Sequence, residues 1–85
     1  MKKLNSFDES YRKLDPISQK KIRKAIRLMA EDLRHPSLQA RKLTGREYIW
    51  YCRADRDLRI TFQFDETGDI VLRNCGHHDP TLKKP

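Results

Sequence analysis

Cysteine, glycine and proline are scarce in this sequence, and it has no long apolar run. The two cysteines do not form a C-x-x-C pair and are too few for a disulfide scaffold. Three glycines and four prolines are too few for a disordered, low-complexity chain. The absence of a bilayer-length apolar stretch, a signal peptide and a lipidation motif favours a cytoplasmic protein. We therefore expect residues 1–85 to form one small domain with only shallow surface sites.

Basic residues, in contrast, are abundant. The chain has 19 Lys and Arg against 12 Asp and Glu, which gives a net charge of +7. The natural partners of such a surface are polyanions, namely nucleic acid, an acidic protein or anionic lipid. Lipid is the least favoured of the three, because nothing in the sequence directs the chain to a membrane.

A short helix is predicted near the start of the chain. The segment from Ser6 to Glu9 fits a capping box, in which the two side chains satisfy each other's backbone N–H groups. Apolar residues then recur at i, i+4 and i+7, which puts one stripe on a single helical face: Phe7, Tyr11 and Leu14.

A second and longer helix follows directly. Asp15 and Pro16 are typical of an N-cap followed by proline in the first helical position. His35-Pro36 ends the helix, because the residue before a proline disfavours the helical region. One face of this helix is apolar through Ile22, Ile26, Met29 and Leu33.

From residue 47 onward the periodicity changes from 3.6 to 2. Residues 58–64 alternate cleanly, which predicts a strand with one apolar and one polar face. Turn residues at 54–57 and 65–69 separate it from strands before and after, and residues 1–5 are weak evidence for an edge strand. The expected fold is α+β, with two N-terminal helices packed on a small antiparallel sheet of three to four strands.

Four segments, taken in order, resemble the RelE/ParE superfamily of bacterial toxin–antitoxin toxins. They are "SFDESYRKLDP", "HPSLQARKLTG", "IWYCRADRDLRITFQF" and "IVLRNCGHHD". The last of these is most similar to the branch of YafQ-like and RelE-like mRNA interferases. The resemblance implies a RelE-like fold, cleavage of mRNA on the ribosome without a metal or cofactor, and inhibition of translation. It also implies an acidic antitoxin partner, with operator DNA bound only through the antitoxin complex.

RNA cleavage of this kind needs a base, an acid and positive charge on the transition state. His78 is the candidate for proton transfer, because imidazole titrates near neutrality, and Asp79 either orients it or acts as a base. Arg59 lies on the polar face of the predicted strand, where a guanidinium can hold a phosphate with paired N–H donors. Arg53 adds a second charge, and Asp57 aligns with a catalytic acidic residue of the family.

Further basic residues are expected to bind the RNA backbone. Three aromatic residues, Tyr48, Trp50 and Tyr51, could offer stacking surfaces for splayed bases, although Trp50 is more typical of a core residue. The predicted RNA-binding set is Arg41, Lys42, Arg46, Lys24 and Arg73.

Other interpretations of the sequence compete with this one. A metal site at residues 74–79 is disfavoured, because adjacent His77 and His78 diverge on a strand. A nucleophilic Cys75 is disfavoured too, because burial in an apolar strand suppresses the thiolate. At the level of function, the alternatives are a ParE-like inhibitor of DNA gyrase and an inactive relative that only binds its antitoxin.

Overall fold

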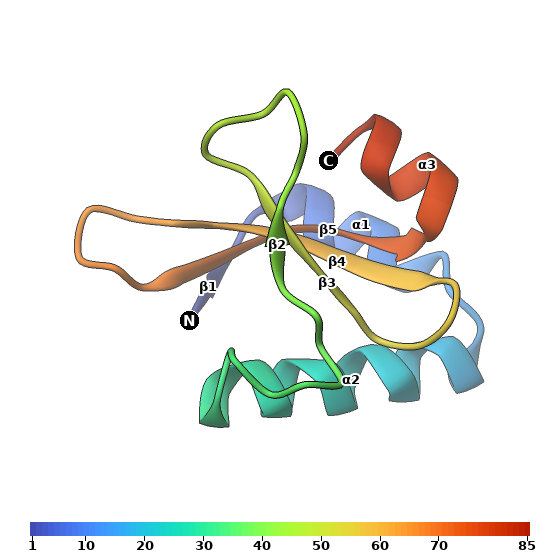
Figure 1. Ribbon diagram of the computed structural model, residues 1–85. Coiled ribbons are helices and arrows are strands. Elements are labelled where there is room, and N and C mark those ends of the chain that lie inside the picture. Colours follow the sequence, from blue (N-terminus) through green and yellow to red (C-terminus); the bar gives the residue numbers. More distant parts are fainter.

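The computed structural model describes residues 1–85 as a five-stranded sheet with three helices. The elements in chain order are β1 (Lys2–Lys3), α1 (Asn5–Arg12), α2 (Pro16–Glu31), β2 (Arg41–Lys42), β3 (Trp50–Arg53), β4 (Leu58–Phe64), β5 (Ile70–His77) and α3 (His78–Lys83). The strand order is β1-β5-β4-β3-β2, with β1 parallel to β5 and every other pair antiparallel (Figure 1). The expected α+β architecture is confirmed.

The sheet has one strand more than expected, and its first pair is parallel. The two edge strands, β1 and β2, have only two residues each and are exposed. Such short segments show no alternation of apolar and polar residues, so periodicity does not detect them. Each becomes a strand because its backbone pairs with a longer strand, β1 with β5 and β2 with β3.

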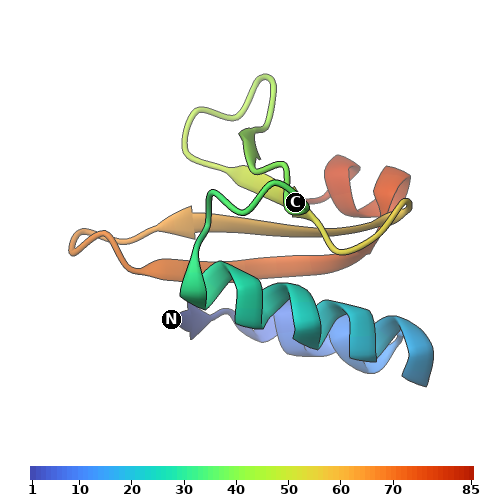
Figure 2. The same cartoon turned by 60° about the horizontal axis from the view of Figure 1, so that its bottom comes forward.

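The helices divide the molecule into layers. In Figure 2, α1 and α2 lie side by side on one face of the sheet, while α3 and the loop of residues 43–49 lie on the other. The core fills the space between the first pair of helices and the sheet. Its central side chains are fully buried, namely Ile22 from α2 and Ile60 and Phe62 from β4. The predicted polar face of β4 is therefore the face turned away from α1 and α2. No helix is long and apolar enough to cross a membrane.

The start of α2 is as predicted. Pro16 occupies the first turn, and the Asp15 carboxylate accepts a hydrogen bond from the backbone N–H of Ser18 at 3.0 Å. This bond satisfies one of the unpaired N–H groups at the helix end. Hydrogen bonding to the side chain of Ser18, and then to its backbone N–H, lowers the pKa of Asp15. The helix ends at Glu31, ahead of the expected His35, and the backbone becomes extended at Asp32.

The predicted capping box is wrong. Helix α1 already begins at Asn5, Leu4 is its N-cap, and no side chain caps it. The Ser6 hydroxyl instead donates to the carbonyl of Arg73 on β5, at 2.6 Å. The reason is tertiary: Leu4 N–H bonds to the Leu72 carbonyl at 2.9 Å, and this continuation of the β1–β5 pairing sets where the helix starts.

Helix α3 was not predicted from the sequence. It follows β5 without a loop and folds back on β4 and β5. Tertiary hydrogen bonds hold its end on the sheet: Thr61 Oγ1 donates to the Pro85 carbonyl at 2.9 Å, and Asn74 Nδ2 donates to the Lys84 carbonyl at 2.8 Å. Six residues are too few for a helix to be stable alone, so these contacts decide its formation.

Candidate active site

A small cleft of about 160 Å³ lies where β2, β3, β4 and the start of α3 meet. Four residues predicted from the sequence line it together: Arg41, Arg53, Arg59 and His78. The sheet register explains the arginines, since Arg53 is directly opposite Arg59 in the β3–β4 pair. Of the other two lining residues, Gln39 was not predicted, and Tyr51 was expected only as a stacking surface.

Two backbone carbonyls hold the side chain of Arg59 in place. Its side chain is buried, with the residue only 9% exposed. Nη1 donates to the carbonyls of Asp55 at 2.9 Å and Leu58 at 3.0 Å. Burial lowers the pKa of Arg59, and the like charge of Arg53 lowers it further. A bound anion would relieve this repulsion, so the pair is suited to hold a phosphate.

Gln39 orients the second arginine. Its side-chain oxygen accepts a hydrogen bond from Arg53 Nη1 at 3.1 Å. Its backbone has a φ of +46°, in the left-handed region that a non-glycine residue rarely adopts. No periodicity or motif marks this residue in the sequence, because its role depends on the approach of the 32–40 connection to β3. One hydrogen bond of that approach joins Arg53 N–H to the Leu38 carbonyl at 2.7 Å.

His78 stands at the cleft as the first residue of α3. Its Nδ1 lies 3.0 Å from Asp79 Oδ1, so Asp79 is placed to orient the ring, and Nε2 is the second position that can carry a proton. The side chain of Asp79 is largely exposed. Asp79 thus touches the cleft only through His78.

Asp57 has a different place from the one its alignment suggested. Its carboxylate is hydrogen-bonded to His77 Nδ1, and this bond lowers the pKa of Asp57. Its other oxygen accepts from the backbone N–H of His78 at 3.4 Å. Asp57 therefore does not line the cleft but fixes the junction of β5 and α3. His77 and His78 contact different carboxylates and diverge, as predicted.

The predicted RNA-binding residues are not all on one surface. Lys42 lies over the Trp50 ring at 5.6 Å, Arg73 lies over the Tyr48 ring at 5.6 Å, and Arg46 is exposed in the 43–49 loop. Lys24 is exposed on α2, which covers the opposite face of the sheet (Figure 2). Lys24 thus does not join the residues around the cleft.

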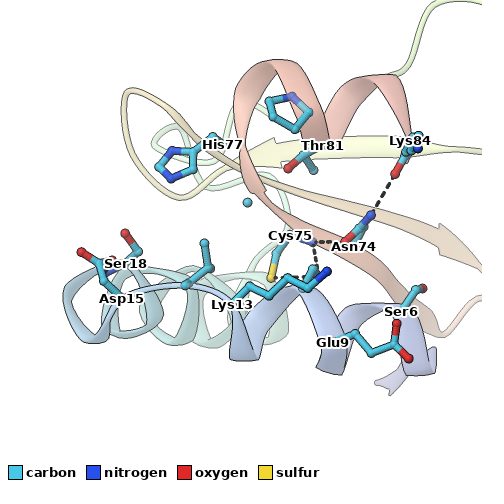
Figure 3. A pocket seen from close by; sticks show the side chains of 14 residues that line it. Ser6, Glu9, Lys13, Asp15, Ser18, Asn74, Cys75, His77, Thr81 and Lys84 are labelled. Atoms are coloured by element: carbon cyan, nitrogen blue, oxygen red, sulfur yellow. Dashed lines mark hydrogen bonds between the residues drawn. The ribbon is translucent and has the colours of Figure 1, made fainter.

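A larger hollow of about 570 Å³ lies on the other flank of β5, between α1, the start of α2 and α3. Figure 3 shows Asn74 reaching the Lys84 carbonyl across it and Asp15 and His77 at its rim. It is lined by none of the predicted arginines. The chemistry expected from the sequence therefore belongs to the smaller cleft.

Both cysteines are packing residues. Burial raises the pKa of Cys52 to about 12 and that of Cys75 to about 11, so both are protonated thiols at neutral pH. Cys75 Sγ lies 3.6 Å from the hydroxyl of Ser10, and Cys52 Sγ lies 3.7 Å from Met29 Sδ. This agrees with the interpretation of Cys75 as an apolar residue of its strand.

Asp55 organises the turn that carries Arg59, and its role was not recognised in the sequence. Its Oδ1 accepts from the N–H groups of Asp57 at 2.9 Å and Leu58 at 2.7 Å, and its Oδ2 pairs with Lys21 Nζ at 2.9 Å. Burial alone would raise the pKa of Asp55, but these hydrogen bonds outweigh it and lower the pKa to about 2. The turn chemistry of "ADRD" was the available signal.

The lowered pKa predicts a pH-dependent contribution to stability. A carboxyl that titrates at about 2 when folded and about 3.8 when unfolded stabilises the fold above pH 4 and loses this effect as the pH falls to 2. We expect Asp55→Ala to lower the free energy of unfolding at pH 7 by roughly 1 to 3 kcal/mol, because two N–H groups lose their acceptor. The difference from wild type should shrink between pH 4 and pH 2, measured by urea unfolding. Glu66→Gln, at an exposed turn position, is the control, and an equal deficit of Asp55→Ala at every pH would contradict the prediction.

Comparison with known proteins shows similarity of structure rather than of sequence. No family model matches the chain, and no curated protein matches it. A solved structure of an antitoxin–toxin complex, RelB–RelE from Methanococcus jannaschii, has a chain that matches with a TM-score of 0.75 at 15% identity, over 94% of this chain and 93% of that one. The YoeB/ParE toxin from Agrobacterium tumefaciens matches with a TM-score of 0.73 at 20% identity, over 92% and 99%. A chain of the E. coli DinJ–YafQ complex matches with a TM-score of 0.70 at 10% identity, over 93% and 92%.

These matches span nearly the whole length of both chains in each pair. They confirm the RelE-like fold that the four sequence segments implied. At identities of 20% or less the similarity is one of fold, and activity depends on the residues of the cleft.

Proposed function

We propose that this chain, which has the fold of the RelE-superfamily toxins, is the toxin of a toxin–antitoxin system and acts as a ribosome-dependent mRNA endoribonuclease. The observation that carries the proposal is the convergence of Arg41, Arg53, Arg59 and His78 on one cleft. The fold does not need three guanidinium groups at this place, and they lie beside an imidazole, a side chain that can both donate and accept a proton.

The chemistry proposed for the cleft is internal transfer within the RNA. The 2′-hydroxyl oxygen attacks the adjacent phosphorus and loses its proton, the bond to the 5′-oxygen breaks, and that oxygen receives a proton. The products are a cyclic phosphate and a free 5′-hydroxyl. His78 takes part in one of the two proton transfers, and Asp79 either holds its ring or takes part in the other.

The arginines have a separate task. Negative charge on the phosphate oxygens grows in the transition state, and preorganised guanidinium groups stabilise it. Arg59 is fixed by the Asp55 and Leu58 carbonyls and Arg53 by Gln39, so neither side chain has to be ordered when the phosphate arrives. Asp57 does not contact the RNA in this scheme but positions His78 by accepting a hydrogen bond from its backbone N–H.

The positive charge of the chain agrees with RNA and an acidic antitoxin as its proposed partners. A net charge of +7 on 85 residues favours binding to ribosomal RNA and mRNA, and also to an acidic antitoxin protein. Operator DNA would then be bound only through the antitoxin complex. The RelB–RelE structure from Methanococcus jannaschii holds a toxin of this fold together with an antitoxin, which supports a partner of the same kind here.

The test is expression of the chain in a bacterial host that lacks the antitoxin. We expect growth arrest, loss of translation and cut transcripts, measured by primer extension on mRNA, and relief of all three when the antitoxin is co-expressed. Normal growth with intact transcripts would contradict the toxin role. Growth arrest with intact transcripts and inhibited DNA supercoiling would instead indicate a ParE-like inhibitor of DNA gyrase.

A further inference from the structure

Tyr48 is an aromatic residue exposed to solvent near the edge of the sheet. It is 60% exposed and lies in the loop of residues 43–49, just before β3. The loop around it is held in place, because Leu43 N–H bonds to the Ile49 carbonyl at 2.8 Å and Arg46 N–H bonds to the Leu43 carbonyl at 3.1 Å. The neighbouring side chain of Ile49 is fully buried and anchors this end of the loop.

Arg73 supports the Tyr48 ring. The centre of its guanidinium lies 5.6 Å from the ring centroid, a distance typical of a cation–π contact. The guanidinium is itself fixed, since Nη1 donates to Gln63 Oε1 and Nε donates to the Pro85 carbonyl at 3.2 Å. One face of the Tyr48 ring is therefore covered by a guanidinium that two hydrogen bonds hold in place. We call this arrangement the backed ring.

A bulge in β5 explains why Arg73 reaches this position. Thr61 pairs with Asn74 and Phe62 pairs with Leu72, which leaves Arg73 as the extra residue of β5. A bulge of this kind redirects a side chain at the point where pairing is irregular. The sequence pattern of alternating residues in β5 does not reveal it.

The backed ring lies on the same face of the sheet as the arginine cleft. Gln63, which holds Arg73, is four residues after Arg59 on β4, and residues 59, 61 and 63 share one face. Four residues of strand correspond to roughly 13 Å. Tyr48 also lies two residues before the start of β3, the strand that carries Arg53. A strand of RNA with one phosphate in the cleft thus has the ring within reach of a neighbouring nucleotide.

We propose that the Tyr48 ring, backed by Arg73, is a stacking site for one unpaired nucleobase of the RNA that enters the cleft. The proposal rests on the proposed function and adds a binding site for a base beside the site for the phosphate. An exposed, preorganised aromatic ring offers a face for stacking at little entropic cost, and the arginines of the cleft hold a phosphate of the same strand. Because stacking uses the face of any base, the site contributes affinity and register rather than sequence preference.

A nucleobase fits these observations better than a peptide does. Arg73 packs against the ring and Arg46 lies in the same loop, so two cationic groups outweigh the neighbouring Glu47 and favour a negatively charged backbone. An acidic peptide would have to supply a carboxylate for the arginines and a separate flat side chain for the ring. A nucleotide carries a phosphate and a flat base in one unit. Binding of an acidic protein at Tyr48 in place of a base would overturn the proposal.

The experiment measures binding of short single-stranded RNA by fluorescence. The probe carries 2-aminopurine, whose emission falls on stacking, at successive positions, and the protein carries His78→Ala so that the RNA stays intact. We expect quenching at one position of the probe. Tyr48→Ala should remove the quenching and weaken binding by about fivefold to 150-fold, the range found when a single base–aromatic stack is lost. Tyr48→Phe should retain both, because it keeps the ring.

Two controls separate stacking from a general loss of structure. Ile17→Ala removes another exposed side chain, on α2, and should change nothing. RNA with an abasic nucleotide at the quenched position should bind the parent protein as weakly as the normal RNA binds Tyr48→Ala, and Tyr48→Ala should have no further effect on it. Arg53→Ala should lower the slope of affinity against salt by about one charge, whereas Tyr48→Ala should leave the slope unchanged.

The results that overturn the stacking site differ from those that overturn the function. If Arg53→Ala weakens RNA binding but Tyr48→Ala does not, the cleft binds RNA and the stacking site is wrong. Weaker antitoxin binding by Tyr48→Ala with unchanged RNA affinity would also refute it. If the protein binds no RNA at low salt, or if Arg53→Ala has no effect on binding, the stacking site is refuted, whereas the proposed function is refuted only by intact transcripts in the expression test.

Discussion

His78→Ala and Arg59→Lys are each expected to abolish growth arrest and to slow mRNA cleavage by about 100-fold to 10,000-fold. His78→Ala removes the only imidazole that lines the cleft, and with it the group proposed to transfer a proton. Arg59→Lys keeps the charge and the aliphatic stem but loses the planar fork that binds two phosphate oxygens at once. The measurement is transcript cleavage after induction, followed by primer extension.

The choice of lysine at residue 59 matters because Arg59 is buried. Arg59→Ala leaves a cavity and frees the Asp55 and Leu58 carbonyls, so a loss of activity in that variant has two explanations. Circular dichroism and thermal unfolding should show that Arg59→Lys and His78→Ala remain folded. Arg27→Ala, at an exposed position on the far side of α2, is the matched control and should remain toxic. Two folded variants with full toxicity would mean that the chemistry lies elsewhere.

Gly76→Ala is expected to destabilise the protein by roughly 2 to 5 kcal/mol and to impair cleavage as well. Gly76 has a φ of +151°, where side chains other than glycine are strained, and a Cβ atom would lie 2.8 Å from Thr81 Oγ1. The collision separates α3 from β5, and α3 carries His78. The free energy of unfolding in guanidinium chloride measures the first effect and transcript cleavage the second.

Gly68→Ala is a control for the cost of a positive φ without a steric collision. Gly68 also has a positive φ, of +84°, but a Cβ atom there would meet nothing within 4 Å. Gly68→Ala should therefore cost only about 1 kcal/mol and leave activity intact. Adding Thr81→Ala to Gly76→Ala should restore part of the stability, whereas adding Thr81→Ser, which keeps the hydroxyl, should not. Equal losses for Gly68→Ala and Gly76→Ala would show that the contact with α3 is unimportant.

The helices and central strands could be predicted because their signals are local. The Asp15 cap, the apolar stripe of α2 and the alternation of residues 58–64 each arise from spacing within a few residues. The edge strand β1 was only weakly indicated, and β2 and α3 were not predicted, since two-residue strands and a six-residue helix form only through partners elsewhere in the chain. The capping box failed for the same reason, because the pairing of β1 with β5 moved the helix start.

The candidate site was predicted in part. Arg41, Arg53, Arg59 and His78 were chosen from residue type, strand position and family resemblance, and the structure brings them to one cleft. No motif marks Gln39, the turn motif at residues 54–57 gave only a general signal for Asp55, and Tyr48 was expected only as one of several stacking surfaces. Lys24 lies on a helix that covers the other face.

The sequence by itself determined the α+β class, the polar face of β4 and the basic charge, because each depends on the order of residues along the chain. Tertiary structure alone decided that Arg53 faces Arg59, that Asp57 holds the junction before α3, and that Arg73 backs Tyr48. These depend on strand register, on one bulge and on the close approach that Gly76 allows. Such features are set by pairing between distant segments, and a shift of one residue would turn each side chain to the opposite face.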